Sequence, residues 1–274
     1  MVAARLTRET RITVLTGAGV SAASGVPTFR GPGRLAEAAS VLCGEDGRWR
    51  RFRPEELADA QAFARDPRLV WEWYDWRRSL IAACRPNRAH DVLAAWSRRF
   101  PRFTLVTQNV DGLHEAAGTK EVVRMHGSIW HVRCARPCAA GATPWRDDAQ
   151  RTQRPQRPQS QPLSADSASS AFDVPACPHC GGLTRPAVVW FGEALDQAIV
   201  ARATAATDCD VFFAVGTSAV VYPAAGLLHE AKRHGAFTVE INPEATDASH
   251  LVDAAIAQPA EAALDAIDAM IDTS

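Results

Sequence analysis

The feature that most constrains this chain is a run of small residues that follows a short apolar segment near its N-terminus. Residues 12–15 are typical of a buried strand, and residues 16–33 then read T-G-A-G-V-S-A-A-S-G-V-P-T-F-R-G-P-G. Gly17 and Gly19 permit a tight turn and a close approach of the backbone to a ligand. Since Ala22 stands where a dinucleotide-binding loop has its third glycine, the spacing alone leaves two interpretations open, a nucleotide site and an ordinary strand–turn–helix corner.

The composition excludes several classes of partner. The chain has 274 residues, of which 47% are apolar and 22% charged, and its net charge is −1. A near-neutral protein has no strong field for nucleic acid or an anionic membrane, and no apolar run approaches the roughly 18 residues of a membrane-spanning helix. The first ten residues lack the apolar stretch of a secretory signal. We therefore expect a cytoplasmic protein, a monomer, that binds neither nucleic acid nor membranes.

Apolar, β-rich segments alternate with helical patterns along most of the chain. Further strands are expected at 103–107, 121–125, 183–193, 211–215 and 237–241. Helices are expected at 35–42, 54–63, 68–83, 86–100, 196–207 and 260–271, and a further helix is expected to begin at 222–225. This alternation is typical of an α/β fold with a doubly wound parallel sheet.

Two excursions leave the alternating pattern, so we expect two domains. The large, Rossmann-like domain would comprise residues 1–30, 85–127 and 185–274. A smaller composite domain would combine a helical segment, 31–84, with a metal-binding ribbon, 128–184. Ligands are expected to meet in the cleft between the two.

Four of the seven cysteines form two close pairs, Cys134 with Cys138 and Cys177 with Cys180. Two such pairs are typical of a tetrahedral Cys₄ zinc site, and four thiolates leave no open position for catalysis, so this zinc would be structural. Three residues separate the first pair, which lies within the usual range, and His179 is the alternative ligand. Residues 146–171, between the pairs, are polar and proline-rich, which predicts a disordered insertion.

Polar side chains stand directly after two of the predicted strands. Gln108, Asn109 and Asp111 follow the strand at 103–107, and His126 follows the strand at 121–125. The carboxyl end of a strand is where an α/β fold places its ligands, and a histidine there can act as a general base near neutral pH. A polar turn and a structural histidine are the alternatives that the pattern alone leaves open.

The run from Gly17 to Arg30 resembles the signature loop G-A-G-x-S-x-x-S-G-[IV]-P-x-F-R of the sirtuins, the NAD-dependent protein lysine deacylases, at every fixed position. The resemblance extends over nearly the whole chain. Similar motifs stand at 86–90 (P-N-R-A-H), 108–111 (Q-N-V-D), 126–127 (H-G), 185–193 (R-P-A-V-V-W-F-G-E), 216–218 (G-T-S) and 241–244 (I-N-P-E).

The resemblance implies that NAD is the co-substrate and that His126 is the catalytic base, with Gln108 and Asn109 ordering the nicotinamide ribose and Asp111 binding the carboxamide. It implies NAD contacts from Gly17, Ala18, Gly19, Ser21, Ala22, Pro27, Thr28, Phe29, Arg30, Gln108, Asn109, Val110, Asp111, Gly216, Thr217, Ser218, Asn242, Pro243, Glu244 and Ala260.

The same resemblance implies a reaction. The acyl oxygen attacks C1′ of the nicotinamide ribose, nicotinamide leaves, and His126 deprotonates a ribose hydroxyl that attacks the alkylimidate. The products are free lysine, nicotinamide and O-acyl-ADP-ribose. Protein ADP-ribosyl transfer at the same NAD site is an alternative activity, and an NAD-sensing module without catalysis is an alternative of another class.

A tyrosine and an arginine suggest which acyl group is removed. By spacing alone, Tyr74 and Arg77 lie on one helical face and form either a carboxylate receptor or part of a core stripe beside a solvated arginine. The run W-E-W-Y-D-W-R-R at 71–78 is similar to the W-E-[FW]-Y-x-x-R-R of class III sirtuins. The resemblance implies that these two residues bind the distal carboxylate of succinyl- and malonyl-lysine, with acetyl-lysine a weaker substrate. A deacetylase without acidic-acyl preference is the alternative.

The acyl-lysine protein or peptide is the expected partner. In sirtuins the segment that resembles residues 185–193 pairs with the substrate by main-chain hydrogen bonds, as an added β-strand. The contacts implied for this chain are Val189, Phe191, Gly192 and Glu193.

Overall fold

The computed structural model describes residues 1–26, 54–136, 138, 143–147, 173–218 and 224–272. Several predictions concern residues outside these ranges. They are the helix at 35–42, most of the polar insertion, and the NAD contacts Pro27, Thr28, Phe29 and Arg30.

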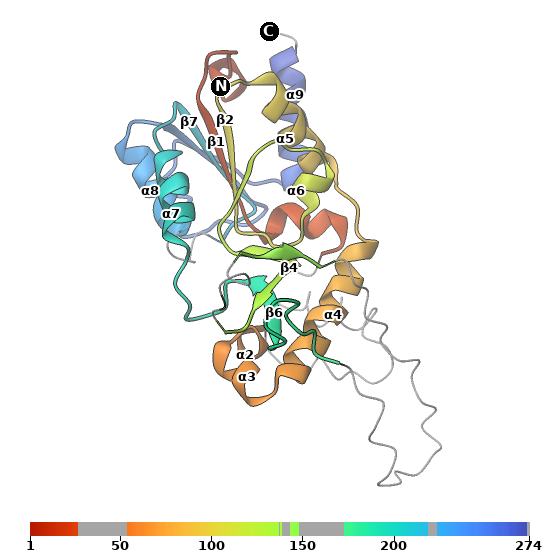
Figure 1. The fold of residues 1–274 in the computed structure, drawn as a ribbon. Helices are drawn as coiled ribbons and strands as arrows, with labels where there is room; N and C mark the ends of the chain where they lie inside the picture. The colour runs from red at the N-terminus through yellow and green to blue at the C-terminus, as the bar shows by residue number, and fades with distance from the viewer. Residues whose placement is uncertain (27–53, 137, 139–142, 148–172, 219–223, 273–274) are drawn as a thin grey trace.

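The larger of two sheets has six strands in the order β3-β2-β1-β7-β8-β9, and all neighbouring strands are parallel (Figure 1). Its strands are β1 Ile12–Thr16, β2 Phe103–Thr107, β3 Val122–Arg124, β7 Val211–Val215, β8 Phe237–Ile241 and β9 Ala254–Ile256. The chain winds outward from β1 in both directions, which confirms the predicted doubly wound sheet. The edge strand β9 was not predicted.

Helices cover both faces of this sheet (Figure 1). On one face lie α5 Arg88–Arg99 and α9 Ala260–Asp272, and on the other α7 Gln197–Ala205 and α8 Ala224–Arg233. Side chains alternate along β1, so Ile12 and Val14 pack against α5 and α9 while Leu15 packs against α8. Because both faces are covered, β1 and β7 are buried throughout. The short helices η1 Ala3–Arg5 and α6 Leu113–Ala116 contact α9 and α5, respectively.

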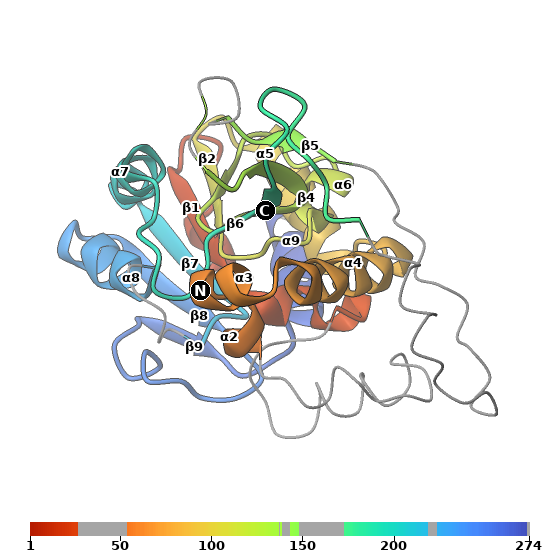
Figure 2. The ribbon, with the colours of Figure 1, turned by 60° about the horizontal axis from the view of Figure 1, so that its bottom comes forward.

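A second core lies beneath the end of the large sheet (Figures 1 and 2). It joins the helices α2 Pro54–Leu57, α3 Ala60–Arg65 and α4 Pro67–Ala83 to a three-stranded sheet of β4 Gly127–Cys134, β5 Trp145–Arg146 and β6 Thr184–Val188. The aromatic stripe of α4 faces this sheet, because Trp71 and Tyr74 pack with Ile129 and Val188. Trp71 also donates a hydrogen bond to the carbonyl oxygen of Thr184, which ties α4 to β6.

The prediction of a single helix over 54–63 is wrong, because the segment forms two helices separated by Ala58 and Asp59. The Asp59 carboxylate accepts hydrogen bonds from the N–H groups of Gln61 and Ala62, so it caps α3. The Ala58 carbonyl accepts from the N–H of Phe191, so a contact far along the chain stabilises the break. The strand predicted over 183–193 likewise ends early, at Val188.

The small-residue loop after β1 folds into a short helix. It forms a 3₁₀-helix, η2 Ala18–Ser24, that follows the extended residue Gly17 and ends at Gly25 with φ +87°. A left-handed residue there favours glycine.

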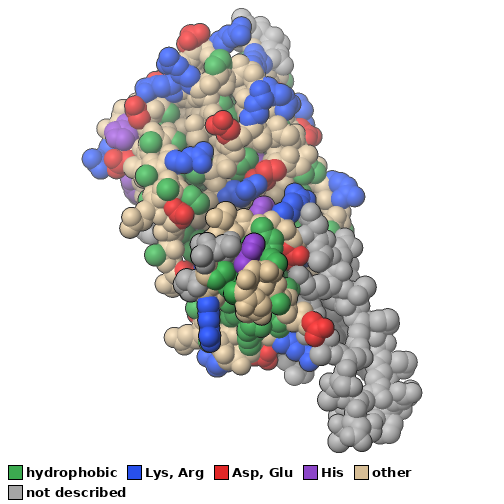
Figure 3. Space-filling model, viewed as in Figure 1, with side chains coloured by type: hydrophobic (Ala, Val, Ile, Leu, Met, Phe, Trp, Pro, Cys, Tyr) green, Lys and Arg blue, Asp and Glu red, His purple; other side chains and the backbone are tan. Residues whose placement is uncertain are grey.

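On the face drawn in Figure 3, basic and acidic side chains are interspersed over the large domain, and hydrophobic side chains gather over β4 and β6. Among the helices in the described ranges, none is long and apolar enough to cross a membrane.

Candidate active site

The carboxyl ends of neighbouring strands bring the predicted polar residues together. In the sheet, Thr16 of β1 is in register with Thr107 of β2 and Val215 of β7. The loops after these strands therefore begin at one level, at the edge where α/β sheets bind ligands. The Gln108 N–H bonds the Thr16 carbonyl at 3.0 Å and the Gly17 N–H bonds the Val215 carbonyl at 3.0 Å, so the loops are joined from their first residue.

The glycines of these loops are needed for contact between the loops themselves. A Cβ on Gly17 would lie 2.7 Å from the carbonyl oxygen of Gly216. A Cβ on Gly19 would lie 2.7 Å from the Cα of Gly216. Gly216 has φ +58°, and a Cβ on it would lie 2.5 Å from the nitrogen of Val20. These glycines thus allow one strand-end loop to approach another, and the close approach to a ligand stays a prediction.

The Q-N-V-D side chains hold the three loops in place. Asn109 Nδ2 donates to the Gly17 carbonyl at 3.0 Å, and Gln108 Nε2 donates to Thr217 Oγ1 at 2.9 Å. The Ser21 hydroxyl donates to Asp111 Oδ2 at 2.8 Å. Burial raises the pKa of Asp111, and the bond from Ser21 opposes that shift. The result is a rigid edge of amide, hydroxyl and carboxylate groups, a donor and acceptor set that suits ribose hydroxyls and a carboxamide.

The remaining predicted NAD contacts lie around this edge. Asn242 follows β8 and donates through Nδ2 to the Thr217 carbonyl at 3.2 Å. Ala260 is buried at the start of α9, and Pro243 and Glu244 are exposed. Four further contacts, Ala18, Ala22, Val110 and Ser218, are partly exposed.

His126 lies between the two sheets, after β3 and before β4. Its Nδ1 is 3.0 Å from the carbonyl oxygen of Gln108. Since a carbonyl only accepts, Nδ1 carries the proton and Nε2 remains available as a proton acceptor. Burial lowers the pKa of His126, so the ring is neutral near pH 7. The carbonyl of His126 accepts from the N–H of Val189 at 3.0 Å, which joins the base to the predicted peptide segment.

Tyr74 and Arg77 lie on α4, which packs against β4 and β6. Tyr74 is fully buried, and its hydroxyl oxygen accepts a hydrogen bond from Trp190 Nε1 at 2.9 Å. Burial raises the pKa of Tyr74 to about 12, so the phenol stays protonated. Burial also lowers the pKa of Arg77, while its attraction to Tyr74 and Asp111 opposes that shift. Arg77 is therefore attracted both to Tyr74, the other member of the predicted acyl receptor, and to Asp111 of the predicted NAD site.

The segment after β6 holds the four predicted peptide contacts. Val189 is partly exposed, Phe191 is 46% exposed, and Gly192 has φ +79°. The Glu193 carboxylate instead accepts two hydrogen bonds from Arg185, at 2.5 and 2.9 Å, and one from the Trp190 N–H. The side chain of Glu193 thus shapes the segment, and Phe191 and Gly192 are the residues most open to a peptide.

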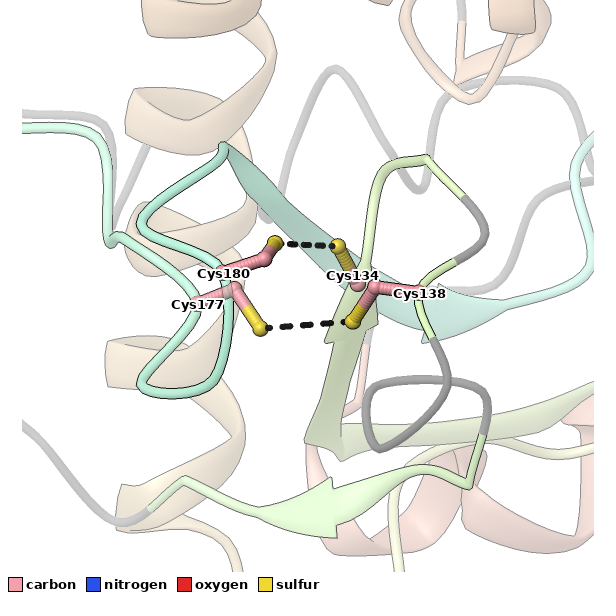
Figure 4. Close-up of side chains that lie close together, drawn as sticks. All are labelled: Cys134, Cys138, Cys177 and Cys180. Atoms are coloured by element: carbon pink, nitrogen blue, oxygen red, sulfur yellow. Dashed lines mark hydrogen bonds between the residues drawn. The ribbon is translucent and has the colours of Figure 1, made fainter.

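The four predicted metal ligands come together at the end of β4 and in the turn before β6 (Figure 4). Cys134 Sγ lies 3.5 Å from Cys180 Sγ, and Cys138 Sγ lies 3.9 Å from Cys177 Sγ. Zn–S bonds of 2.3 Å in a tetrahedron place sulfurs about 3.8 Å apart, so the cluster fits zinc. A disulfide would need about 2.0 Å. The wider first pair reaches the cluster, and His179 is not among its members.

The comparisons with known proteins agree with this site. A family model described as the Sir2 family matches residues 17–223. The chain belongs to the Sir2 family. This confirms the sirtuin resemblance seen in the motifs.

The Sir2 relatives match along almost their whole lengths. The "NAD-dependent protein deacylase" of Aquifex aeolicus is 44% identical over 88% of this chain and 87% of its own. A crystal structure of a Sir2 homolog–NAD complex matches with a TM-score of 0.77 and 38% identity, over 97% of this chain and 91% of that one. A mutant Sir2 homologue in complex with 2′-O-acetyl ADP ribose matches with a TM-score of 0.76 and 37% identity, over 97% and 94%.

Beneath the site, this Sir2 chain has a buried polar layer that sequence reasoning missed. Thr16 Oγ1 donates to Thr107 Oγ1 at 2.8 Å and lies 3.0 Å from His114 Nε2. Thr107 Oγ1 also accepts from the N–H of Asn109, and the ring of His90 lies 4.8 Å from that of His114. The available signal was a threonine at the end of one predicted strand, Thr107, and another directly after a second, Thr16. Sequence reasoning also gave no role to Trp190, whose signal is an indole among the peptide contacts.

Proposed function

We propose that this NAD-dependent protein deacylase of the Sir2 family removes succinyl and malonyl groups and, more slowly, acetyl groups from lysine. The deacylase activity is supported by the names of its relatives and by the His126 geometry. The acyl preference rests on one observation, that Tyr74 and Arg77 lie three residues apart on α4 and that Arg77 is attracted electrostatically to both Tyr74 and Asp111.

In this proposal the strand-end loops hold NAD, whose ribose accepts the acyl group. Gln108 and Asn109 are fixed by hydrogen bonds to Thr217 and Gly17, so they keep their orientation without a ligand. His126 takes a proton at Nε2 while its Nδ1–H stays on Gln108. The 2′-O-acetyl ADP ribose bound by a Sir2 homologue of 37% identity is the product type that such a reaction would form.

Two hydrogen-bond donors, the Arg77 guanidinium and the Tyr74 phenol, favour acidic acyl groups. A guanidinium keeps its charge, and a phenol with a pKa of about 12 keeps its proton, so both donate at neutral pH. A distal carboxylate forms charge-assisted bonds with them, which are roughly twice as strong as neutral ones. An acetyl group has no distal carboxylate and gains nothing from either residue. The receptor therefore favours succinyl- and malonyl-lysine over acetyl-lysine.

The substrate backbone would lie along the segment after β6. Its inner side is already bonded to the protein, because the N–H groups of Val189 and Phe191 donate to His126 and Ala58. The exposed Phe191 and Gly192 are left for a peptide strand. We place the acyl-lysine there because the bond from Val189 to His126 brings this segment next to the base.

The test uses one peptide carrying succinyl-, malonyl- or acetyl-lysine, incubated with and without NAD and followed by mass spectrometry. We expect NAD-dependent loss of all three groups, with acetyl the slowest. The double change Tyr74→Phe, Arg77→Met should abolish the acidic-acyl preference and leave deacetylation in place. Arg68→Met, at an exposed arginine of the same helix that pairs with Glu72, is the matched control.

Three results would contradict the proposal in different ways. Faster loss of acetyl than succinyl by the wild type would refute the acyl preference but not the deacylase. Equal loss of both activities in the double variant would return Tyr74 and Arg77 to a purely structural role. Transfer of label from adenine-labelled NAD to protein, without deacylation, would favour ADP-ribosyl transfer.

A further inference from the structure

Trp190 makes a contact that bears on which way the Tyr74 hydroxyl donates. The indole Nε1–H donates to the Tyr74 oxygen at 2.9 Å, and the two side chains are 3% and 0% exposed. An indole N–H cannot accept, so the proton of the Tyr74 hydroxyl cannot return this bond. Within the described ranges no acceptor for that proton is present. A buried hydroxyl with one oxygen lone pair occupied and its proton unused is poised to donate to a ligand.

The indole is itself held firmly. The Arg185 guanidinium lies 3.3 Å from the centroid of the Trp190 ring, and the ring of Phe63 lies 5.3 Å away. Glu193 binds Arg185 through both oxygens and also accepts the main-chain N–H of Trp190. With its ring stacked and its backbone bonded, Trp190 keeps its N–H directed at Tyr74.

The electrostatics strengthen the same arrangement. A cation against the face of an indole withdraws electron density and makes the N–H a better donor. Donation to the Tyr74 oxygen in turn polarises the phenol O–H, as successive hydrogen bonds do in a low-dielectric interior. The last group in this series of contacts is the Tyr74 hydroxyl, which would meet the acyl carboxylate.

We propose that Trp190 is a positioning residue for acyl specificity, whose indole N–H fixes the Tyr74 hydroxyl as a hydrogen-bond donor toward the carboxylate of a succinyl or malonyl group. The inference rests on the proposed function, because it needs an acidic acyl group beside Tyr74. It adds that the receptor comprises three side chains and that the third comes from the peptide segment. The loop that would bind the substrate backbone thus also adjusts selectivity for its acyl group.

The experiment begins with the ratio of kcat/KM for succinyl- over acetyl-lysine peptide in the wild type and in Trp190→Phe. We expect about a tenfold fall in the succinyl value, mainly through KM, because one hydrogen bond at a charged ligand is lost. The acetyl value should change by less than about twofold. Trp96→Phe is the matched control, because it removes another buried indole N–H, bonded to Asp268 on the far helix layer.

Two further variants separate positioning from packing. Replacement of Trp190 by 3-benzothienylalanine exchanges the N–H for sulfur in a ring of the same shape, and should reproduce the effect of Trp190→Phe without a cavity. In a Tyr74→Phe background, Trp190→Phe should have no additional effect on the succinyl value, since the hydroxyl that it orients is gone.

The outcomes that overturn the inference are distinct. An unchanged ratio in both Trp190 variants, or an equal fall for both acyl groups, would refute it while leaving the wild-type preference intact. Additive effects of Tyr74→Phe and Trp190→Phe would refute it as well. A wild type without acidic-acyl preference would refute the proposed function and this inference together, and that result is known before any variant is measured.

Discussion

His126 Nδ1 lies 3.0 Å from the main-chain carbonyl oxygen of Gln108, the first residue after β2. Among the residues that the structure describes, the partner of the base is therefore a backbone carbonyl, and no titratable side chain is bonded to its ring. The same residue, Gln108, uses its side chain to bond Thr217, so one position links the base to the β7 loop. Any change that moves the end of β2 moves the base as well.

The first prediction concerns the pH dependence of deacylation. Burial lowers the pKa of His126 below its ordinary 6.5, so Nε2 stays unprotonated to a lower pH than in an exposed histidine. The acid limb of the kcat/KM profile should thus lie below pH 6.5. His126→Ala should lower kcat by at least about 100-fold. An acid limb above pH 6.5 would show that another group titrates. So would an acid limb that persists in the His126→Ala variant.

The second prediction concerns Gly127, which has φ +79° and no room for a side chain. A Cβ there would lie 2.1 Å from the carbonyl oxygen of Ala187, so Gly127→Ala must push β4 and β6 apart beside His126. We expect a loss of about 2 kcal/mol or more in unfolding free energy and a larger loss of activity. Gly235→Ala is the control, because it has φ +85° but open space around it. Equal losses of unfolding free energy in the two variants, measured by urea unfolding, would show that the contact with Ala187 does not destabilise Gly127→Ala.

The third prediction concerns zinc. Cys138→Ser should remove about one zinc ion per chain, measured by elemental analysis, and lower the melting temperature, because the metal joins β4 to the turn before β6. Cys209→Ser changes a buried thiol outside the cluster and should leave the zinc content unchanged. Full zinc occupancy in Cys138→Ser would mean that another ligand replaces it.

The fourth prediction concerns acid stability. Burial lowers the pKa of His90 to about 4, and the pKa of His114 lies well below its ordinary 6.5. Between pH 6.5 and about 4 the unfolded chain binds protons at these residues that the folded chain does not, so the unfolding free energy falls as pH falls. For His90 the loss reaches about 3 kcal/mol near its folded pKa.

Urea unfolding at several pH values checks this, with His90→Gln as the comparison. His90 Nδ1 accepts from the N–H of Asn87 in a capping box, and glutamine can fill the same place without titrating. The pH dependence should be shallower in the variant. Parallel curves for variant and wild type would show that His90 does not contribute.

Much of the fold could be predicted because its signals are local. The strands at residues 12–15, 103–107, 211–215 and 237–241 are short apolar runs followed by small or polar residues, and the parallel order follows from their alternation with helices. The helix predicted at 68–83 from its aromatic residues agrees to within one residue with the observed α4, Pro67–Ala83. The cysteine spacing predicted the cluster, because four thiolates have few other uses in such pairs.

The rest depends on contacts between distant residues, which spacing does not reveal. The break at Ala58 depends on Phe191, and the Tyr74 hydroxyl is oriented by Trp190, 116 residues away. The strand β9 has little pattern of its own, since Ala254–Ile256 becomes a strand by pairing with β8. The glycine loop shows the same limit, because its partner is Gly216.

The cysteine cluster has a consequence for how the gene can change. Cys138 Sγ and Cys177 Sγ lie 3.9 Å apart although 39 positions separate the two residues. Whatever the length of the segment between these two cysteines, its ends are held together at the cluster. The entropic cost of closing a loop rises only slowly with its length. Insertions and deletions there leave the anchoring pairs in place, so this is the position at which lineages can diverge in length and at which an epitope can be grafted without displacing the catalytic histidine.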